Sequence, residues 1–265
     1  MLKRKNLLKL YTQIFSRPYF YRFNKFLFDI SLRGLGIYCS KSGIKYFYSE
    51  LLQEIISDNE PVIFDVGANV GINTTLLNKN FPSASIYSFE PNPKCFEKLK
   101  IIEKSNIKVF DLALGDKIKK IKLYDRESTE LTKHSTFYKD VIKELHSSAL
   151  TEYEVNVTTL DKICEQENIN KIDFLKIDTE GNDYYVLNGA KNLLSNNAIS
   201  CIQFEFNTMN VMSRVFFRDF ILLLQNYKLY RILPTGLLKL NSNILYTEIY
   251  GLQNIVAVLD HDNSS

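Results

Sequence analysis

The chain has 265 residues, of which 45% are hydrophobic, and its formal net charge is +3 at neutral pH. This length allows a full hydrophobic core in one large domain, or in one domain with an appendage, and excludes a small scaffold that depends on covalent staples. The four cysteines lie far apart and form no C-x-x-C pair, which argues against a zinc site or a disulfide framework. Unpaired cysteines indicate a reducing compartment, so we expect a cytoplasmic protein.

Residues 1–58 are expected to form a helical extension that is basic and aromatic, with no acid before Asp29. The segment lacks the long apolar stretch and cleavage site of a secretory signal, and it is too charged to span a bilayer. Two interpretations stay open for it. Its aromatic side packs on the main domain, or its basic face rests on the inner face of a membrane or meets an anionic substrate.

From residue 59 to residue 262 short apolar runs alternate with helical patterns, which predicts a single α/β domain. Expected strands cover residues 61–68, 83–92, 106–116, 171–181, 198–207, 228–234 and 254–260, with an exposed antiparallel strand at 117–125. Expected helices cover residues 72–80, 93–105, 157–167 (capped by Thr159), 183–196 and 214–227. The pattern predicts a doubly wound, mostly parallel sheet with an antiparallel hairpin at its far edge.

Acidic residues stand at or near the ends of four expected parallel strands: Asp65, Glu90, Asp178 and Glu205. In open sheets of this kind ligands bind beyond the carboxyl ends of the strands, where the strand order reverses. We therefore expect these carboxylates to share one rim and to face one ligand site.

The turn after the first of these strands reads Gly67-Ala68-Asn69-Val70-Gly71. It is neither the G-x-G-x-x-G dinucleotide fingerprint nor a P-loop, because no Gly-Lys-Ser/Thr follows. An acid before the turn and no cation after it suit a ligand with close backbone contacts and a positive centre. S-adenosylmethionine, which has a sulfonium and no phosphate, fits this description.

The next two strand ends extend this hypothesis. Glu90 follows Asp65 by 25 positions and is expected to accept hydrogen bonds from ribose hydroxyls; the alternative is that Glu90 caps the following helix. At the third strand the backbone of Ala113 and Leu114 is expected to meet adenine, with Asp111 near its amino group. The alternative for Asp111 is ordinary turn chemistry.

The fourth strand carries three charged residues spaced by two, Lys176, Asp178 and Glu180, followed by Gly181. An extended backbone places such residues on one face. Burying two carboxylates and an ammonium is costly unless they pair or serve a ligand. We predict a functional trio, and the structural alternative is that Lys176 only neutralises Asp178.

Between about residues 60 and 210 the chain resembles the FkbM-type S-adenosylmethionine-dependent methyltransferases. The resemblance is carried by "FDVGANVG", "FEPNP", "ALGD", "TTLDKIC", "DFLKIDTEGNDYYVLNGA" and "IQFEFN", in that order. It implies a class I methyltransferase fold, Rossmann-like with a seven-stranded sheet. It also implies methylation of hydroxyl groups on sugars or natural products, because many members belong to surface-polysaccharide gene clusters.

The resemblance implies that Asp178 and Glu180 lie near the transferred methyl group, and that strand-end residues contact the cofactor. The full set of expected cofactor contacts is Asp65, Gly67, Ala68, Asn69, Gly71, Asn73, Thr74, Glu90, Pro91, Asn92, Asp111, Ala113, Leu114 and Asp178. The family often has Glu where this chain has Asp183, which shortens that side chain.

The expected function is O-methylation of a hydroxyl group on a sugar or glycan, as in surface polysaccharides, or on a related natural product. The expected acceptor is a small molecule or a glycan, and a lipid-linked glycan is one of the alternatives. Asp178 is the first candidate for the general base. Lys176, Glu180, His134 and His146 are the other catalytic candidates, and both histidines lie in a polar stretch, residues 125–153, that is expected to act as a lid. A divalent metal such as magnesium is left open, with Asp178 and Glu205, joined by Asn207, as its ligands.

Three other functions fit the sequence less well. Nucleic-acid methylation is disfavoured because the rim acids would repel a phosphate backbone. A nicotinamide-dependent oxidoreductase would need the missing third glycine. A non-catalytic Rossmann-like protein of glycan assembly would be expected to lose either "DVGANVG" or "KIDTEG", and both are intact. The oligomeric state is not predicted.

Overall fold

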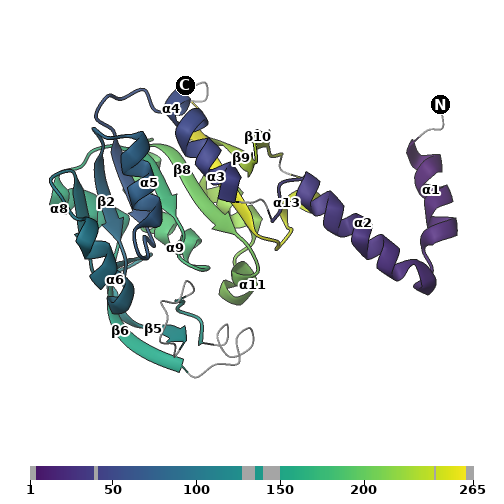
Figure 1. Cartoon of the computed structure of the whole chain (residues 1–265), viewed down its shortest axis with the longest axis horizontal. Helices are drawn as coiled ribbons and strands as arrows, with labels where there is room; N and C mark the ends of the chain where they lie inside the picture. The colour runs from purple at the N-terminus through teal and green to yellow at the C-terminus, as the bar shows by residue number, and fades with distance from the viewer. Residues whose placement is uncertain (1–3, 39–40, 127–134, 140–149, 242, 261–265) are drawn as a thin grey trace.

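A mostly parallel β-sheet with helices on both faces forms the body of the protein in a computed structural model (Figure 1). The structure describes residues 4–38, 41–126, 135–139, 150–241 and 243–260. Within them the main sheet has eight strands in the order β10-β9-β11-β8-β7-β1-β2-β3. These are β1 (Val62–Val66), β2 (Ser85–Phe89), β3 (Ile107–Phe110), β7 (Ile172–Ile177), β8 (Ile199–Phe206), β9 (Tyr227–Leu233), β10 (Gly236–Lys239) and β11 (Gln253–Leu259).

A second, smaller sheet of three strands has the order β4-β6-β5. Its strands are β4 (Ala113–Leu114), β5 (Lys119–Arg126) and β6 (Leu150–Thr158). The helices of the body are α3 (Lys41–Tyr46), the π-helix η2 (Phe47–Leu51), α4 (Leu52–Ile55), α5 (Ile72–Asn80), α6 (Pro93–Leu99), η3 (Lys100–Ile102), α8 (Leu160–Glu167), α9 (Asp183–Asn188), α10 (Lys191–Ser195), α11 (Met209–Ser213), α12 (Phe217–Leu223) and α13 (Ile244–Thr247).

The predicted class I arrangement is confirmed. Strand β1 pairs in parallel with β2 and β7, and β7 pairs in parallel with β8. The edge differs in detail from the expectation. Strand β11 lies inside the sheet, antiparallel to both β8 and β9, and the edge hairpin is β9–β10. The short run of β10, which has no strong strand pattern of its own, is recruited by this hairpin and adds an eighth strand to the predicted seven.

Two predicted elements are each divided into two in the structure. The third predicted strand divides after Phe110, and β4 pairs with β6 in the second sheet. The helix predicted over 183–196 divides into α9 and α10 around Gly189. A Cβ at Gly189 would lie 2.0 Å from the carbonyl oxygen of Gly115, so backbone contact with that loop requires glycine there. The Thr159 cap is confirmed, because its hydroxyl accepts a hydrogen bond from the Lys162 N–H at 3.2 Å.

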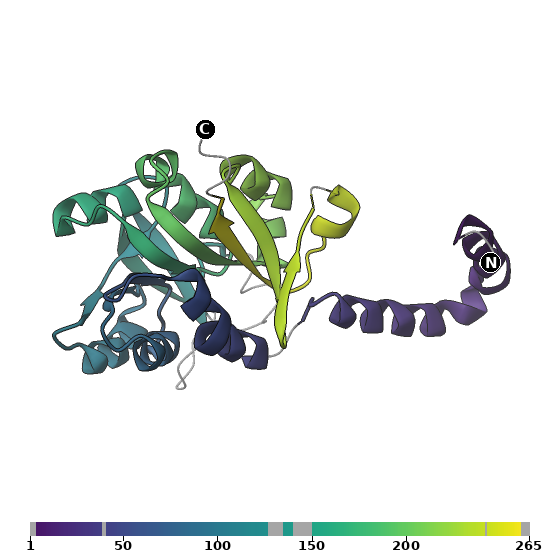
Figure 2. The ribbon, with the colours of Figure 1, turned by 90° about the horizontal axis from the view of Figure 1, so that it is seen from above.

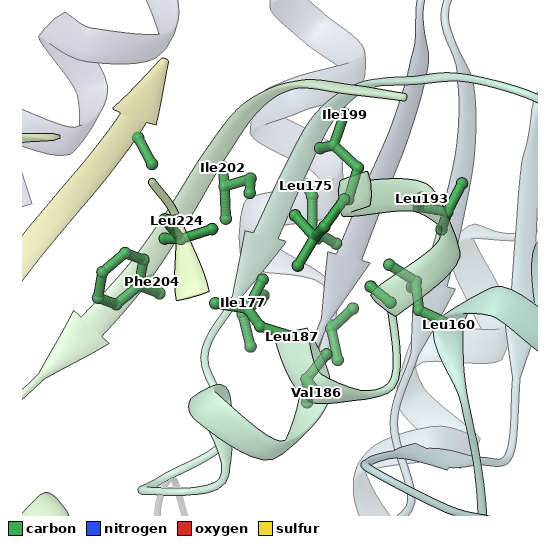
Figure 3. Close-up of a cluster of buried hydrophobic side chains, with 14 of the residues drawn as sticks. Leu160, Leu175, Ile177, Val186, Leu187, Leu193, Ile199, Ile202, Phe204 and Leu224 are labelled. Carbon is green, nitrogen blue, oxygen red and sulfur yellow. The ribbon is translucent and has the colours of Figure 1, made fainter. Parts of the chain in front are cut away.

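Alternate residues of the central strands pack against helices on opposite faces of the sheet. On β1 and β7, Phe64 and Leu175 belong to one buried cluster, whereas Ile63 and Phe174 belong to another. Figure 3 shows the first cluster, in which Leu175 and Ile177 of β7 lie among side chains of α8, α9, α10 and the segment after α12. Both faces are therefore buried, which explains why these strands read as continuous apolar runs.

The N-terminal region has two parts with different packing. Residues of η2 and α4, including Phe47, Tyr48 and Leu52, are fully buried in the second cluster. Ahead of them α1 (Arg4–Phe15), η1 (Pro18–Phe20) and α2 (Tyr21–Gly34) project away from the body as an arm (Figure 2). In this arm α1 has no buried residue, and α2 has only Leu32. A search of the described residues finds no helix that combines the length and apolar character needed to cross a bilayer.

The base of the arm is anchored by a buried arginine on β9. The guanidinium of Arg231 donates to the carbonyl of Leu35 at 2.7 Å and to Gln253 Oε1 at 2.8 Å. Burial lowers the pKa of Arg231 to about 10. A third, longer bond reaches the carbonyl of Tyr246 at 3.4 Å. One side chain therefore ties the arm to two strands of the antiparallel edge.

Replacing this anchor should destabilise the fold. We expect Arg231→Met to lower the free energy of unfolding by about 1–3 kcal/mol, because buried acceptors lose their donor. Urea denaturation measures this change. The control is Arg218→Met, at an exposed position on α12, which should change little. Equal midpoints for the two variants would contradict the anchoring role.

Candidate active site

The turn after β1 uses three left-handed backbone positions, Gly67 (φ 77°), Asn69 (φ 52°) and Gly71 (φ 82°). The Gly67 and Ala68 N–H groups both donate to the carbonyl of Phe89 at 3.0 Å, which holds the turn against the end of β2. A Cβ at Gly67 would lie 1.9 Å from the carbonyl oxygen of Asp178. Glycine at this position is therefore what lets the ends of β1 and β7 meet.

Glu90, at the end of β2, connects two loops through its carboxylate. Its Oε2 accepts from the Asn69 N–H and its Oε1 from the Asn92 N–H, both at 2.8 Å. The helix-capping alternative is wrong, since Asn92 itself caps α6 by accepting from the Lys94 N–H. Burial raises the pKa of Glu90 to about 7, although the two N–H donors favour its charged form.

A buried ammonium links the ends of β1 and β7. Lys176 lies opposite Asp65 in the strand register and contacts its carboxylate at 2.9 Å and that of Asp178 at 3.5 Å. Asp65 also accepts from the Thr74 hydroxyl at 2.7 Å. Burial works against the Lys176 charge, but the Asp65 and Asp178 carboxylates outweigh it and raise its pKa. Lys176 therefore neutralises both carboxylates, so the spacing of Lys176 and Asp178 has a structural role as well.

The predicted trio of charged residues, Lys176, Asp178 and Glu180, does not share one face of a strand. Strand β7 ends at Ile177, and Glu180 has a left-handed backbone (φ 51°), so the two-residue alternation stops at Asp178. Asp183 begins α9 and is buried, and burial, followed by the nearby Asp178 charge, raises its pKa to about 7. For Glu205 at the end of β8, burial and then the charges of Asp178 and Asp183 raise the pKa well above the ordinary value.

A cavity of about 730 Å³ opens at this carboxyl edge of the sheet. Of the predicted residues, it is lined by Gly67, Ala68, Asn69, Asn73, Glu90, Pro91, Ala113, Leu114, Asp178, Glu180, Glu205 and Asn207. The predicted convergence of Glu90, Asp178 and Glu205 on one space is therefore observed. Five predicted residues do not line it and are buried: Asp65, Gly71, Thr74, Asn92 and Lys176. Asp111 does not line it either and is exposed.

Part of the predicted lid lies over the cavity. Ser135, Thr136 and Phe137 line it, the Ser135 hydroxyl accepts from Asn92 Nδ2 at 2.7 Å, and the Thr136 hydroxyl donates to the carbonyl of Glu180 at 3.2 Å. These bonds join the loop after β2 to the loop after β7. The other predicted lid residues, His134 and His146, lie outside the described residues.

The metal hypothesis gains no ligand set from the part of the chain that the structure describes. It contains no group of three His, Cys, Asp or Glu residues arranged to hold a metal ion. The side chain of Asn207, the third expected ligand, donates to Glu205 Oε2 at 3.2 Å and accepts from the Met209 N–H at 2.7 Å. Asn207 is therefore held in place by hydrogen bonds within the protein, and we derive no metal-dependent step.

Sequence reasoning missed a second wall of the cavity. It is formed by Tyr38, Ile44, Lys45, Thr208, Met209, Leu252 and Asn254. These residues come from the N-terminal region, the loop after β8 and the approach to β11. No local motif marks them, although Asn254 lies opposite Glu205 in the register of β11 and β8.

Comparison with known families agrees with this geometry. Residues 65–232 match the family described as Methyltransferase FkbM domain. The chain belongs to this family. An FkbM domain is a methyltransferase, so the resemblance seen in the motifs and the expected S-adenosylmethionine-dependent class are confirmed. The match begins at Asp65 and ends on β9, so it contains the turn after β1 and the ends of β2, β7 and β8.

The sequence of this chain is similar to those of several named methyltransferases. It is 24% identical over 186 residues to Methyltransferase sdnD of Sordaria araneosa, covering 57% of this chain and 70% of that protein. It is 23% identical to 2-O-methyltransferase NoeI of Sinorhizobium fredii and 27% identical to Hexuronic acid methyltransferase AglP of Haloferax volcanii. Those matches cover 53% and 54% of this chain but only 62% and 55% of the two relatives.

A solved structure supports the fold. The crystal structure of Methyltransferase FkbM from Methylobacillus flagellatus KT superposes with a TM-score of 0.50 at 13% identity. The similarity covers 80% of this chain and 47% of that one. At this identity the comparison shows the shared class I fold.

The raised pKa of Glu90 predicts a pH dependence of stability. The folded protein holds the Glu90 proton more tightly than the unfolded chain, so the free energy of unfolding should fall as the pH rises from about 4.5 to about 7. Urea denaturation across this range should show a smaller fall in Glu90→Gln. Glu97→Gln, on the exposed side of α6, is the control and should keep the wild-type slope. Identical slopes in all three proteins would contradict the assignment.

Proposed function

We propose that the FkbM domain transfers a methyl group from S-adenosylmethionine to a hydroxyl group of a sugar or glycan, the acceptor class of surface polysaccharides. The observation that carries the proposal is one cavity that joins the turn after β1 to the carboxylates of Asp178 and Glu205 at neighbouring strand ends. A related natural product with a sugar-like hydroxyl remains within the same proposal.

The residues around the β1 end fit the cofactor. Gly67 and Asn69 provide a close backbone approach, and Leu112 and Leu114 provide an apolar surface for a flat ring. We assign Glu90 to the ribose hydroxyls, since each carboxylate oxygen keeps a free lone pair after accepting its N–H.

The carboxylates of Asp178 and Glu205, which we call the acidic wall of the cavity, provide the catalytic groups. When bound, S-adenosylmethionine supplies a methyl group on a positively charged sulfur. Asp178 would accept the proton of the acceptor hydroxyl, and its position beside Lys176 holds the carboxylate at the cavity. Proton acceptance of this kind contributes about 10²–10⁴-fold to a rate. Glu205, whose raised pKa favours proton uptake, is the second candidate base.

The choice of a sugar acceptor is supported by the chemistry of the cavity and by two relatives. Carboxylates and side-chain amides such as Glu205 and Asn254 are hydrogen-bonding groups suited to hydroxyls. Two relatives carry the names 2-O-methyltransferase and Hexuronic acid methyltransferase. The nicotinamide alternative is disfavoured because the turn after β1 lacks the third glycine of the dinucleotide fingerprint.

Labelled S-adenosylmethionine with a panel of nucleotide sugars, lipid-linked glycans and polysaccharides tests this function, with mass analysis of the product. Asp178→Asn should lower turnover by about 10²–10⁴-fold. Its cofactor site should stay intact, so S-adenosylhomocysteine at 100 times its Kd should still stabilise it by about 2.7 kcal/mol.

The matched control is Asp58→Asn, at an exposed position before β1, which should keep wild-type turnover. Wild-type turnover in Asp178→Asn would remove Asp178 from the mechanism. Thermal stabilisation by NAD and not by S-adenosylhomocysteine would overturn the proposed function.

We also propose that the arm, residues 4–34, binds an anionic membrane surface, which would bring the domain to lipid-linked acceptors at the inner face. Its apolar side chains are exposed, including Leu7 (57%), Phe26 (59%) and Phe28 (57%). Its basic residues in the described range are Arg4, Lys5, Lys9, Arg17, Arg22, Lys25 and Arg33, against one acid, Asp29. Exposed apolar surface beside basic charge is the chemistry of an interfacial helix.

Co-sedimentation of the full chain with vesicles tests the arm. Vesicles with phosphatidylglycerol should bind it and neutral phosphatidylcholine vesicles should not. The double variant Arg22→Gln/Lys25→Gln should weaken binding by roughly 10-fold or more, because each basic residue near such a surface contributes about 1 kcal/mol. Lys119→Gln/Lys120→Gln on β5 is the control of equal charge. Binding that ignores lipid charge, or an arm-dependent dimer without vesicle binding, would contradict the proposal.

A further inference from the structure

One wall of the cavity comes from a part of the chain outside the family match. Tyr38, Ile44 and Lys45 line the cavity, whereas the match begins at residue 65. These residues belong to the segment between the arm and the buried helices η2 and α4 (Figure 1). The N-terminal region therefore contributes residues to the cavity that lie outside the family match.

A continuous set of contacts places Tyr38 beside the acidic wall. Glu205 lies opposite Asn254 in the register of β8 and β11. Leu252 is two residues before Asn254, about 7 Å along an extended chain, and its carbonyl accepts from the Tyr38 N–H at 2.8 Å. Tyr38 therefore lies on the Glu205 side of the cavity, away from the Glu90 side assigned to the cofactor.

Tyr38 adopts a backbone conformation that tyrosine rarely accepts. Its φ is 59°, in the left-handed region, where a bulky side chain is strained. Its ring lies against Gly251, where a Cβ would be 3.1 Å from Tyr38 Cε2 and 2.5 Å from Ile37 Cγ2. Tyr38 is nonetheless 49% exposed, and it lines the cavity. A strained, partly exposed aromatic residue at a cavity wall is typical of a ligand contact.

We infer that Tyr38 is the stacking platform for the sugar ring of the acceptor, an inference that rests on the proposed function. A sugar ring presents a C–H face, which packs on an aromatic ring, and a rim of hydroxyls, which needs polar partners. Tyr38 offers the first surface, and Asp178 and Glu205 offer the second within the same cavity. The ligand class assigned to this subsite is therefore a cyclic sugar, and Tyr38 determines specificity for it.

A fluorescence titration tests the platform directly, because the chain contains no tryptophan. Tyr38→Trp introduces a single tryptophan at the subsite, whose emission can be excited separately from that of the tyrosines. The probes are methyl glycosides of neutral hexoses, deoxyhexoses and hexuronic acids, with sorbitol as an open-chain polyol that lacks a ring face. At least one glycoside should change the emission saturably, and sorbitol should not. Tyr246→Trp, equally exposed at 52% but outside the cavity, is the control and should not respond.

Kinetics provide the second test, with the acceptor that the labelled assay shows to be methylated. Tyr38→Ala should raise the KM for that acceptor by about 10-fold, whereas Tyr38→Phe, which keeps the ring, should stay near wild type. Both variants should keep the wild-type thermal shift with S-adenosylhomocysteine, because the cofactor half of the cavity is untouched.

An unchanged KM in Tyr38→Ala, or a Tyr38→Trp emission that no glycoside alters or that sorbitol alters equally, overturns the inference. A wild-type protein that S-adenosylhomocysteine does not stabilise overturns the proposed function instead. The tryptophan titration needs no cofactor, so it still decides the role of Tyr38 in that case.

Discussion

The buried ammonium of Lys176 is the constraint on which the geometry of the site depends. It is 2% exposed and lies between Asp65 of β1 and Asp178 beyond β7. Removing a charge from water costs several kcal/mol, and breaking a buried pair costs about 3–5 kcal/mol because one charge is left uncompensated. The two central strand ends are therefore held together, and Asp178 is kept at the cavity while Asp65, which is buried, does not line it.

The neighbouring loops depend on this central link through backbone contacts. Gly67 has no Cβ where the Asp178 carbonyl approaches, and the Asp178 N–H donates to the carbonyl of Val66 at 2.9 Å. Glu90 then fixes Asn69 at the tip of the same turn. Lys176, which does not line the cavity, and Glu90, which does, thus position the groups around the end of β1.

The residues that line the cavity come from inside and from outside the family match. The half around Gly67 and Glu90 lies within the FkbM family match, as do Asp178 and Glu205. Tyr38 and Leu252 lie outside it, before and after the matched residues. A family domain that carries a constant donor chemistry can accept different acceptors if such flanking segments supply the acceptor wall, since function depends on the site and not on the fold.

The sequence by itself determined the alternation of the main strands and helices, the turn after β1 and the acids at the strand ends, because periodicity and short motifs are local properties of the chain. It did not predict β6, which begins in the stretch expected to be a lid, or β10. The convergence of Glu90, Asp178 and Glu205 also followed from sequence, since parallel strands end at one edge. Only the tertiary structure decided which acids reach the cavity. It turned Asp65 inward to Lys176 and left Asp111 on the surface, because an ion pair across two strands depends on register and burial. It likewise brought Tyr38 to Leu252 from more than 200 positions away in the chain, a contact that no local pattern encodes.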